Sequence, residues 1–133
     1  MKRAGHYVVK LSQRRVTLKN RDPNELWWGI DEHPSSNAEE VYVVSSLRID
    51  LGAKPVFVPR SFFADLGEVN KMSVRVISNG CAIRIVGSDA GYGYKAEIRV
   101  KKDLAVERWV RSGEFPDEVW QHDVFHSQFE PGM

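Results

Sequence analysis

The sequence predicts an α+β protein that is mostly antiparallel β, with one or two short helices. Most apolar residues alternate with polar ones, which is the period of a strand with one buried face. The dipeptide Asn79-Gly80, between two alternating runs, is the strongest short hairpin signal in the chain. A helix is favoured over a strand only at residues 59–67 and at Pro116. The strands are therefore expected to form a meander, folded as a half-barrel or a sandwich.

Two long strands are expected in the N-terminal half. Residues 7–18 alternate on both sides of the Arg14–Arg15 pair, and residues 41–51 are rich in β-branched side chains. Between them, the short aromatic stretch "NELWWGID" predicts a strand or a strand-like loop. The polar stretch "HPSSNAEE" that follows has turn chemistry and is not a domain linker. The segment "PRSFFADLG" (59–67) then predicts one or two helical turns that end at Gly67.

Residues 72–111 predict a four-stranded antiparallel meander. The glycine-rich stretch 87–94 is followed by an alternating strand, so it indicates a hairpin turn and not a phosphate loop. A helix competes over residues 103–112, but the alternation continues across the Lys101–Asp103 turn and favours a strand. Its residues Leu104, Val106 and Val110 are expected to share one face. Pro116, followed by two acidic residues, suits the start of a short helix.

The bulk composition predicts a single domain over residues 1–133. A chain of 133 residues can bury about two thirds of its unfolded surface without a metal or a disulfide. Cys81 is the only cysteine, which excludes an internal disulfide and a thiolate-rich zinc site. Lys10 interrupts the first apolar stretch too early for a signal peptide or a membrane span. We therefore expect a cytoplasmic protein, and no membrane partner.

Charge is sorted along the chain although the formal net charge is only +1. Residues 1–21 carry basic side chains and no acidic one: Lys2, Arg3, Lys10, Arg14, Arg15, Lys19 and Arg21. Residues 22–46 and 112–133 are acidic and hold no Lys or Arg. Such sorting indicates a surface for a partner, or pairing of the basic strand with an acidic neighbour inside the fold. A cross-strand pair of opposite charges contributes only ~0.2–1 kcal/mol.

No catalytic set emerges from the motifs, so an enzyme and a cofactor are not expected. His122 and His126 lie four residues apart and would point the same way on a helix or a strand. They are weak metal candidates, because a third ligand would have to come from His6, His33 or a carboxylate. A catalytic carboxylate pair needs two different environments. The acidic residues 114–118 instead share one solvated segment.

Protein binding is the function class that remains. Carboxylates next to large rings combine binding anchors with a negative field that attracts a basic partner. The rings are Trp27, Trp28, Phe115, Trp120, Phe125 and Phe129. The expected partner-contact residues are Asp31, Glu32, Glu39, Glu40, Glu114, Asp117, Glu118, Trp120 and Asp123. A small β-barrel that binds nucleic acid through the basic N-terminal strand is the alternative, although the acidic stretches argue against a polyanion channel.

The run "AEIRVKKDLAVERWVRSGEFPDEVWQHDVF", preceded by "PRSFFADLG" and a meander, resembles small bacterial immunity proteins. These are encoded beside contact-dependent and other polymorphic toxins. The resemblance spans residues 41–125 and rests on the layout and on "VRSGEFPDEVW". It implies a cytoplasmic protein that binds one cognate toxin domain, expected to be a nuclease, and masks its active site or substrate path. A hydrolase built on His122 and His126 is the third hypothesis.

Overall fold

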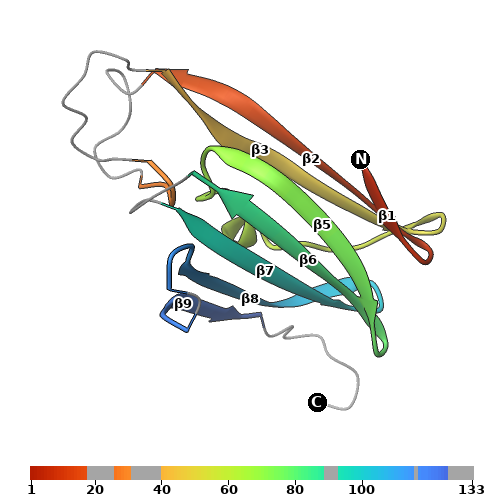
Figure 1. Cartoon of the computed structure of the whole chain (residues 1–133). Helices are drawn as coiled ribbons and strands as arrows, with labels where there is room; N and C mark the ends of the chain where they lie inside the picture. The colour runs from red at the N-terminus through yellow and green to blue at the C-terminus, as the bar shows by residue number, and fades with distance from the viewer. Residues whose placement is uncertain (18–25, 31–39, 89–92, 116, 126–133) are drawn as a thin grey trace.

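The protein forms two antiparallel β-sheets, seen as two layers in the computed structural model (Figure 1). The structure describes residues 1–17, 26–30, 40–88, 93–115 and 117–125. The first sheet has the order β1 (Lys2–Ala4), β2 (Tyr7–Thr17), β3 (Glu40–Leu51) and β4 (Lys54–Pro55). The second has the order β5 (Val69–Ile77), β6 (Gly80–Gly87), β7 (Tyr94–Lys101), β8 (Leu104–Ser112) and β9 (Val119–Val124). The predicted mostly antiparallel β architecture is confirmed.

The predicted α+β class is wrong for the described residues, which contain no α-helix. Segment 59–67 forms only the 3-10 turn η2 (Arg60–Phe62). The backbone leaves the helical path because Leu66 pairs with β3, where the Val44 N–H donates to the Leu66 carbonyl at 2.9 Å. The second predicted helix is also absent from its described part. Pro116 lies outside the described residues, and Glu118 closes a turn before β9 begins.

The N-terminal half follows the predicted pattern. Strand β2 runs unbroken through the Arg14–Arg15 pair and pairs along its length with β3. The pairing shifts after Ser12, which leaves Ser45 of β3 as the extra residue of a bulge. The aromatic stretch is a strand-like loop over residues 26–30, with a single bridge from Trp28 to Leu66.

The predicted meander is confirmed as β5 to β8, and β9 adds a fifth strand. Strand β8 replaces the competing helix at 103–112. The expected common face of Leu104, Val106 and Val110 is wrong, because Val106 is the extra residue of a bulge. The register passes from Arg99 opposite Glu107 to Val100 opposite Ala105. The bulge reverses the alternation, so Ala105 and Val110 both face the core although their numbers differ in parity.

The core lies between the two sheets and includes the 59–67 segment. Val9 and Ile49 of the first sheet, Ile83 and Ile98 of the second, and Phe62 are buried together. Two isolated bridges join the layers at their margins, one from Val43 to Gly67 and one from Phe57 to Leu104. Within the described ranges the strands do not close into a barrel. The barrel that the nucleic-acid alternative assumed is therefore absent from this part of the chain.

Two titratable side chains are part of this packing. Cys81 is fully buried, and burial raises the pKa of its thiol to about 11. Burial likewise raises the pKa of Tyr94, whose hydroxyl donates to the Gly67 carbonyl at 2.7 Å. Both groups therefore stay protonated at neutral pH and serve the core.

Candidate functional site

Ser112, the last residue of β8, and the described residues of the connection to β9 (113–115, 117 and 118) are held by several hydrogen bonds, and we call them the acidic turn. The Ser112 hydroxyl accepts hydrogen bonds from the backbone N–H groups of Glu114 (3.2 Å) and Phe115 (3.1 Å). The Ser112 N–H donates to the Glu118 carbonyl, and the Glu118 N–H donates to the Phe115 carbonyl at 2.8 Å. The Gly113 N–H donates to the Gly93 carbonyl and so ties the turn to the start of β7. These bonds fix the backbone on both sides of Phe115.

The acidic turn presents an aromatic ring among carboxylates, as the sequence predicts. The Phe115 side chain is among the most exposed large apolar groups, with a relative exposure of 63%, and Glu114, Asp117 and Glu118 are exposed around it. Glu118 accepts a hydrogen bond from the Trp120 indole N–H at 2.8 Å. Ion pairs among the described residues include Glu40 and Asp123 but none of the three acids of the turn. The turn therefore combines an apolar anchor with a local negative field.

Trp120 links the acidic turn to a second aromatic ring. Its ring stacks on Trp28 with 5.4 Å between centroids and an interplanar angle of 18°. Trp28 belongs to the loop 26–30, so this stack joins the end of the second sheet to the loop that leaves the first. Trp120 is half-buried, whereas Phe115 is exposed.

Asp123 lies apart from the acidic turn, in an internal ion pair. Its carboxylate contacts Arg108 at 2.7 Å from Nη2 and 2.8 Å from Nε. Arg108 is fully buried, is also paired with Asp65, and donates to the Phe62 carbonyl at 3.2 Å. Burial alone would lower the pKa of Arg108, but the hydrogen bonds and charges of Asp65 and Asp123 raise it. Asp123 is thus engaged inside the fold and does not belong to the acidic turn.

Arg108 and Asp65 are the residues that sequence reasoning missed. A signal for Arg108 was present, because it stands two positions before the apolar Val110 on a strand whose even positions were expected to face inward. A buried arginine requires a carboxylate partner. Nothing in the sequence identified Asp65 as that partner, because it lies in the segment that was expected to be helical.

Of the acidic residues expected to contact a partner between positions 31 and 40, only Glu40 lies in the described part of the chain. This residue begins β3 and pairs with Arg15 of β2 at 3.3 Å, with both side chains more than half exposed. This contact is an example of the internal pairing between the basic strand and an acidic neighbour that the sequence offered as an alternative. Such exposed pairs contribute about 0–1 kcal/mol to stability. Asp31, Glu32 and Glu39 lie outside the described residues. Glu40 lies on β3 of the first sheet, whereas the acidic turn connects two strands of the second sheet.

His122 is engaged in contacts of its own on β9. Its Nε2 lies 2.9 Å from a Glu107 carboxylate oxygen, and its ring stacks on Trp109 at 4.6 Å. His126 lies outside the described residues. In the part of the chain that the structure describes, no three His, Cys, Asp or Glu residues gather as a metal site requires.

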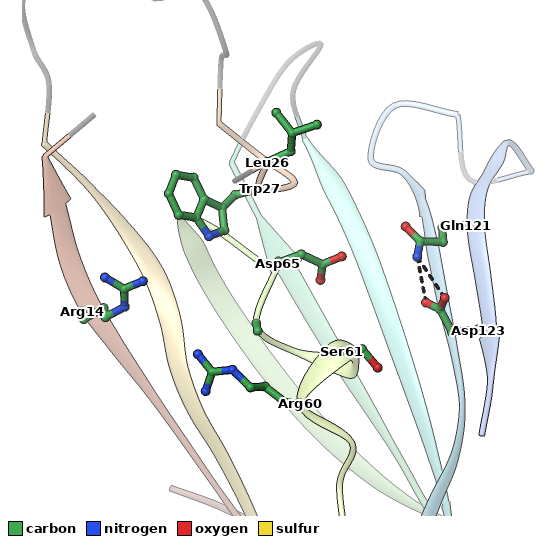
Figure 2. Close-up of a pocket in the computed structure, with 9 residues that line it drawn as sticks. Arg14, Leu26, Trp27, Arg60, Ser61, Asp65, Gln121 and Asp123 are labelled. Atoms are coloured by element: carbon green, nitrogen blue, oxygen red, sulfur yellow. Dashed lines mark hydrogen bonds between the residues drawn. The ribbon is translucent and has the colours of Figure 1, made fainter. Parts of the chain in front are cut away.

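A pocket of about 430 Å³ is lined in part by Asp65 and Asp123, the two carboxylates that pair with Arg108 (Figure 2). Arg14 and Arg60 project toward it from one side, and Asp65 and Asp123 lie on the other. Both carboxylates are already bound by Arg108, and the Gln121 amide donates to Asp123 at 2.9 and 3.1 Å. The residues that line the pocket include no histidine or cysteine. The lining does include the Ser61 hydroxyl, besides the two carboxylates that Arg108 binds.

Comparison of the chain with protein-family models, curated proteins and solved structures finds no match. Among the described residues, no helix has the length and apolar character needed to cross a membrane.

Proposed function

We propose that this chain is a binding protein without catalytic activity, a cytoplasmic immunity protein that neutralises a cognate toxin domain. It would act by masking the active site or the substrate path of that domain. The observation that carries the proposal is the acidic turn, where hydrogen bonds at both ends hold an exposed Phe115 between Glu114 and Glu118. The resemblance of "VRSGEFPDEVW" to immunity proteins concerns the same residues.

The geometry of the turn suits a protein partner for two physical reasons. Aromatic anchors near the centre of an interface carry much of the binding energy. A backbone already fixed by Ser112 loses little conformational entropy on binding, so more of that energy remains as affinity. Around the anchor, the carboxylates would speed association with a basic surface. A nuclease has such a surface because it binds a polyanion.

The His-dependent hydrolase hypothesis receives less support. His122 does not line the pocket of about 430 Å³ and is paired with Glu107 and stacked on Trp109. These contacts occupy the Nε2 atom and one face of the imidazole ring.

Co-expression with the C-terminal domain of the protein encoded immediately upstream tests the proposal. The wild-type chain should restore growth of cells that express this domain, and the two proteins should co-purify. Phe115→Ala should weaken binding by about 30-fold, since a hot-spot ring contributes about 2 kcal/mol or more. Glu114→Lys should slow association. Tyr42→Ala, a change of an exposed ring on β3, is the matched control and should bind like the wild type.

Either of two outcomes would contradict the proposal. The upstream domain could remain toxic, and unbound, in the presence of the folded wild-type chain. Alternatively, Phe115→Ala and Tyr42→Ala could bind equally well, which would exclude the acidic turn from the interface.

A further inference from the structure

The outer face of the five-stranded sheet, opposite the core, is strongly basic. Register places its side chains in rows across the strands, for example Arg84, Glu97, Trp109 and His122 from β6 to β9. The basic members come from four strands: Lys71, Arg75, Arg84, Lys95, Arg99, Lys101 and Arg111. Only two acidic side chains, Glu97 and Glu107, share the face within the described strands. The positive charge is therefore in excess on this surface although the whole chain is nearly neutral.

One carboxylate at the centre of the face is shared by three guanidinium groups. Glu97 lies 3.2 Å from Arg75, 3.7 Å from Arg84 and 3.3 Å from Arg99. Each arginine side chain is nonetheless about half exposed, so its remaining N–H donors face solvent. Five donors on each guanidinium allow it to bind Glu97 and a further anion together.

A stack of planar groups stands in the same region. The Arg99 guanidinium lies 4.8 Å from the centre of the Trp109 ring. The His122 ring is nearly parallel to Trp109, at 4.6 Å and 7°. His122 belongs to β9, the edge strand, so the stack ends at an open margin of the sheet. A further planar group could extend the stack there.

We propose that this outer face binds single-stranded nucleic acid. The phosphates would contact Arg75, Arg84 and Lys95, and a base would stack at the His122 end of the Arg99–Trp109–His122 row. Basic tracks combined with aromatic stacking are the means by which proteins hold single strands without sequence preference. An unpaired strand fits better than a duplex, because a duplex keeps its base faces inside.

This basic face is distinct from the two surfaces that the sequence predicts. It uses neither the basic N-terminal strand nor the acidic turn, so it does not depend on the proposed immunity function. The basic residues do not form a run in the sequence because each occupies an alternate position of a strand. The acidic turn lies in the connection between β8 and β9, so its carboxylates do not form part of the basic rows.

Fluorescence anisotropy with a labelled oligouridylate tests the inference. The wild-type chain should bind at low salt, with an affinity that falls linearly on a logarithmic scale as salt rises. The triple variant Arg75→Gln/Arg84→Gln/Lys95→Gln should bind at least ten-fold more weakly. The slope of log affinity against log salt concentration should become less steep by about 2, since each phosphate contact to a single strand contributes about 0.7 to that slope.

A second triple variant controls for net charge. Lys10→Gln/Arg15→Gln/Arg48→Gln removes three exposed charges from the first sheet and gives the same net charge as the first triple variant. It should bind like the wild type. Trp109→Leu should weaken binding about ten-fold while the salt slope stays unchanged, because stacking releases no counterions.

Several results would overturn the inference. The folded wild-type chain could fail to bind the oligonucleotide at low salt, or the first-sheet triple variant could lose as much affinity as the other. Polyglutamate could compete as well as the oligonucleotide, which would make this a surface for an acidic protein. Phe115→Ala should leave oligonucleotide binding intact, so that failure of this inference is separable from failure of the immunity proposal.

Discussion

Arg108 holds three segments of the chain together through one buried charge. Its guanidinium contacts Asp123 on β9, Asp65 after the η2 turn, and the Phe62 carbonyl within that turn. A buried ion pair is not in itself more stabilising than apolar packing. The Arg108 pair instead fixes the relative positions of these segments, because the planar guanidinium donates its hydrogen bonds only in fixed directions. The 59–67 segment is thereby fixed against the inner side of the second sheet.

Replacement of Arg108 should therefore destabilise the fold. Arg108→Met leaves two partly buried carboxylates without a cation, and we expect a loss of about 3–5 kcal/mol in the free energy of unfolding. Arg108→Lys should not restore stability, because an ammonium group cannot form the paired hydrogen bonds. Urea denaturation measures both variants, with Arg48→Met on exposed β3 as the control. A lysine variant as stable as the wild type would contradict this account.

Glu97 should make stability depend on pH. Burial alone would raise its pKa, but the charges and hydrogen bonds of Arg75 and Arg99 outweigh burial and lower it. A lowered pKa in the folded state adds stability above the ordinary glutamate pKa, and this stability is lost as pH falls through the folded-state value. Glu97→Gln should thus cost about 1 kcal/mol at neutral pH.

The pH series provides the check on Glu97. Urea denaturation of the wild type and of Glu97→Gln should give free energies of unfolding that converge as pH falls below about 4.3, the ordinary glutamate value. A constant difference between the two proteins from neutral to acidic pH would show that the carboxylate charge is not the cause.

Gly80 illustrates how a turn signal can be right for an unexpected reason. The Asn79-Gly80 dipeptide predicts the hairpin, but the two loop residues are Ser78 and Asn79, and Asn79 takes the positive φ of 63°. Gly80 is already the first residue of β6. A Cβ atom placed there would lie 1.7 Å from the Val100 carbonyl oxygen of β7. Glycine is needed because the neighbouring backbone comes close.

Substitutions can distinguish a glycine that is needed because the neighbouring backbone is close from a glycine that only adopts a positive φ. Gly80→Ala should destabilise the protein by about 1–3 kcal/mol, because β6 and β7 must move apart. Gly52 is the matched control, with a positive φ of 60° and open space around its Cβ position. Asparagine tolerates that conformation, so Gly52→Asn should stay within about 0.5 kcal/mol of the wild type. Thermal denaturation compares the two, and equal losses would refute the distinction.

The strands were largely predictable from the sequence, and the irregular points were not. Alternation locates β2, β3 and the meander because one buried face requires it. Bulges such as those at Ser45 and Val106 escape such reasoning, since one extra residue changes which side chains face inward without altering composition. The helix expected at 59–67 failed because tertiary pairing with β3 outweighed a weak local preference.

The sequence reveals a cluster of like charges only where the charged residues are neighbours along the chain. The acidic turn was predicted because Glu114, Asp117 and Glu118 are neighbours in sequence, and the structure keeps them exposed together. The basic face of the second sheet escaped notice because its residues are separated by apolar ones. Once a meander over 72–111 is predicted, however, its polar alternate positions are mostly Lys and Arg. Summing charge by predicted face, and not by segment, would have revealed this surface.

The unequal distribution of charge on this molecule also gives it an electric dipole that its isoelectric point conceals. At a pH near 7.9, where positive and negative groups cancel in number, the protein should scarcely migrate in an electric field. A cation-exchange resin should nevertheless retain it, because the sulfonate surface contacts only the basic face of the protein and does not respond to its net charge. Retention at that pH, abolished by Arg75→Gln/Arg84→Gln/Lys95→Gln but kept by the first-sheet triple variant of equal net charge, would make the asymmetry visible on a chromatography column.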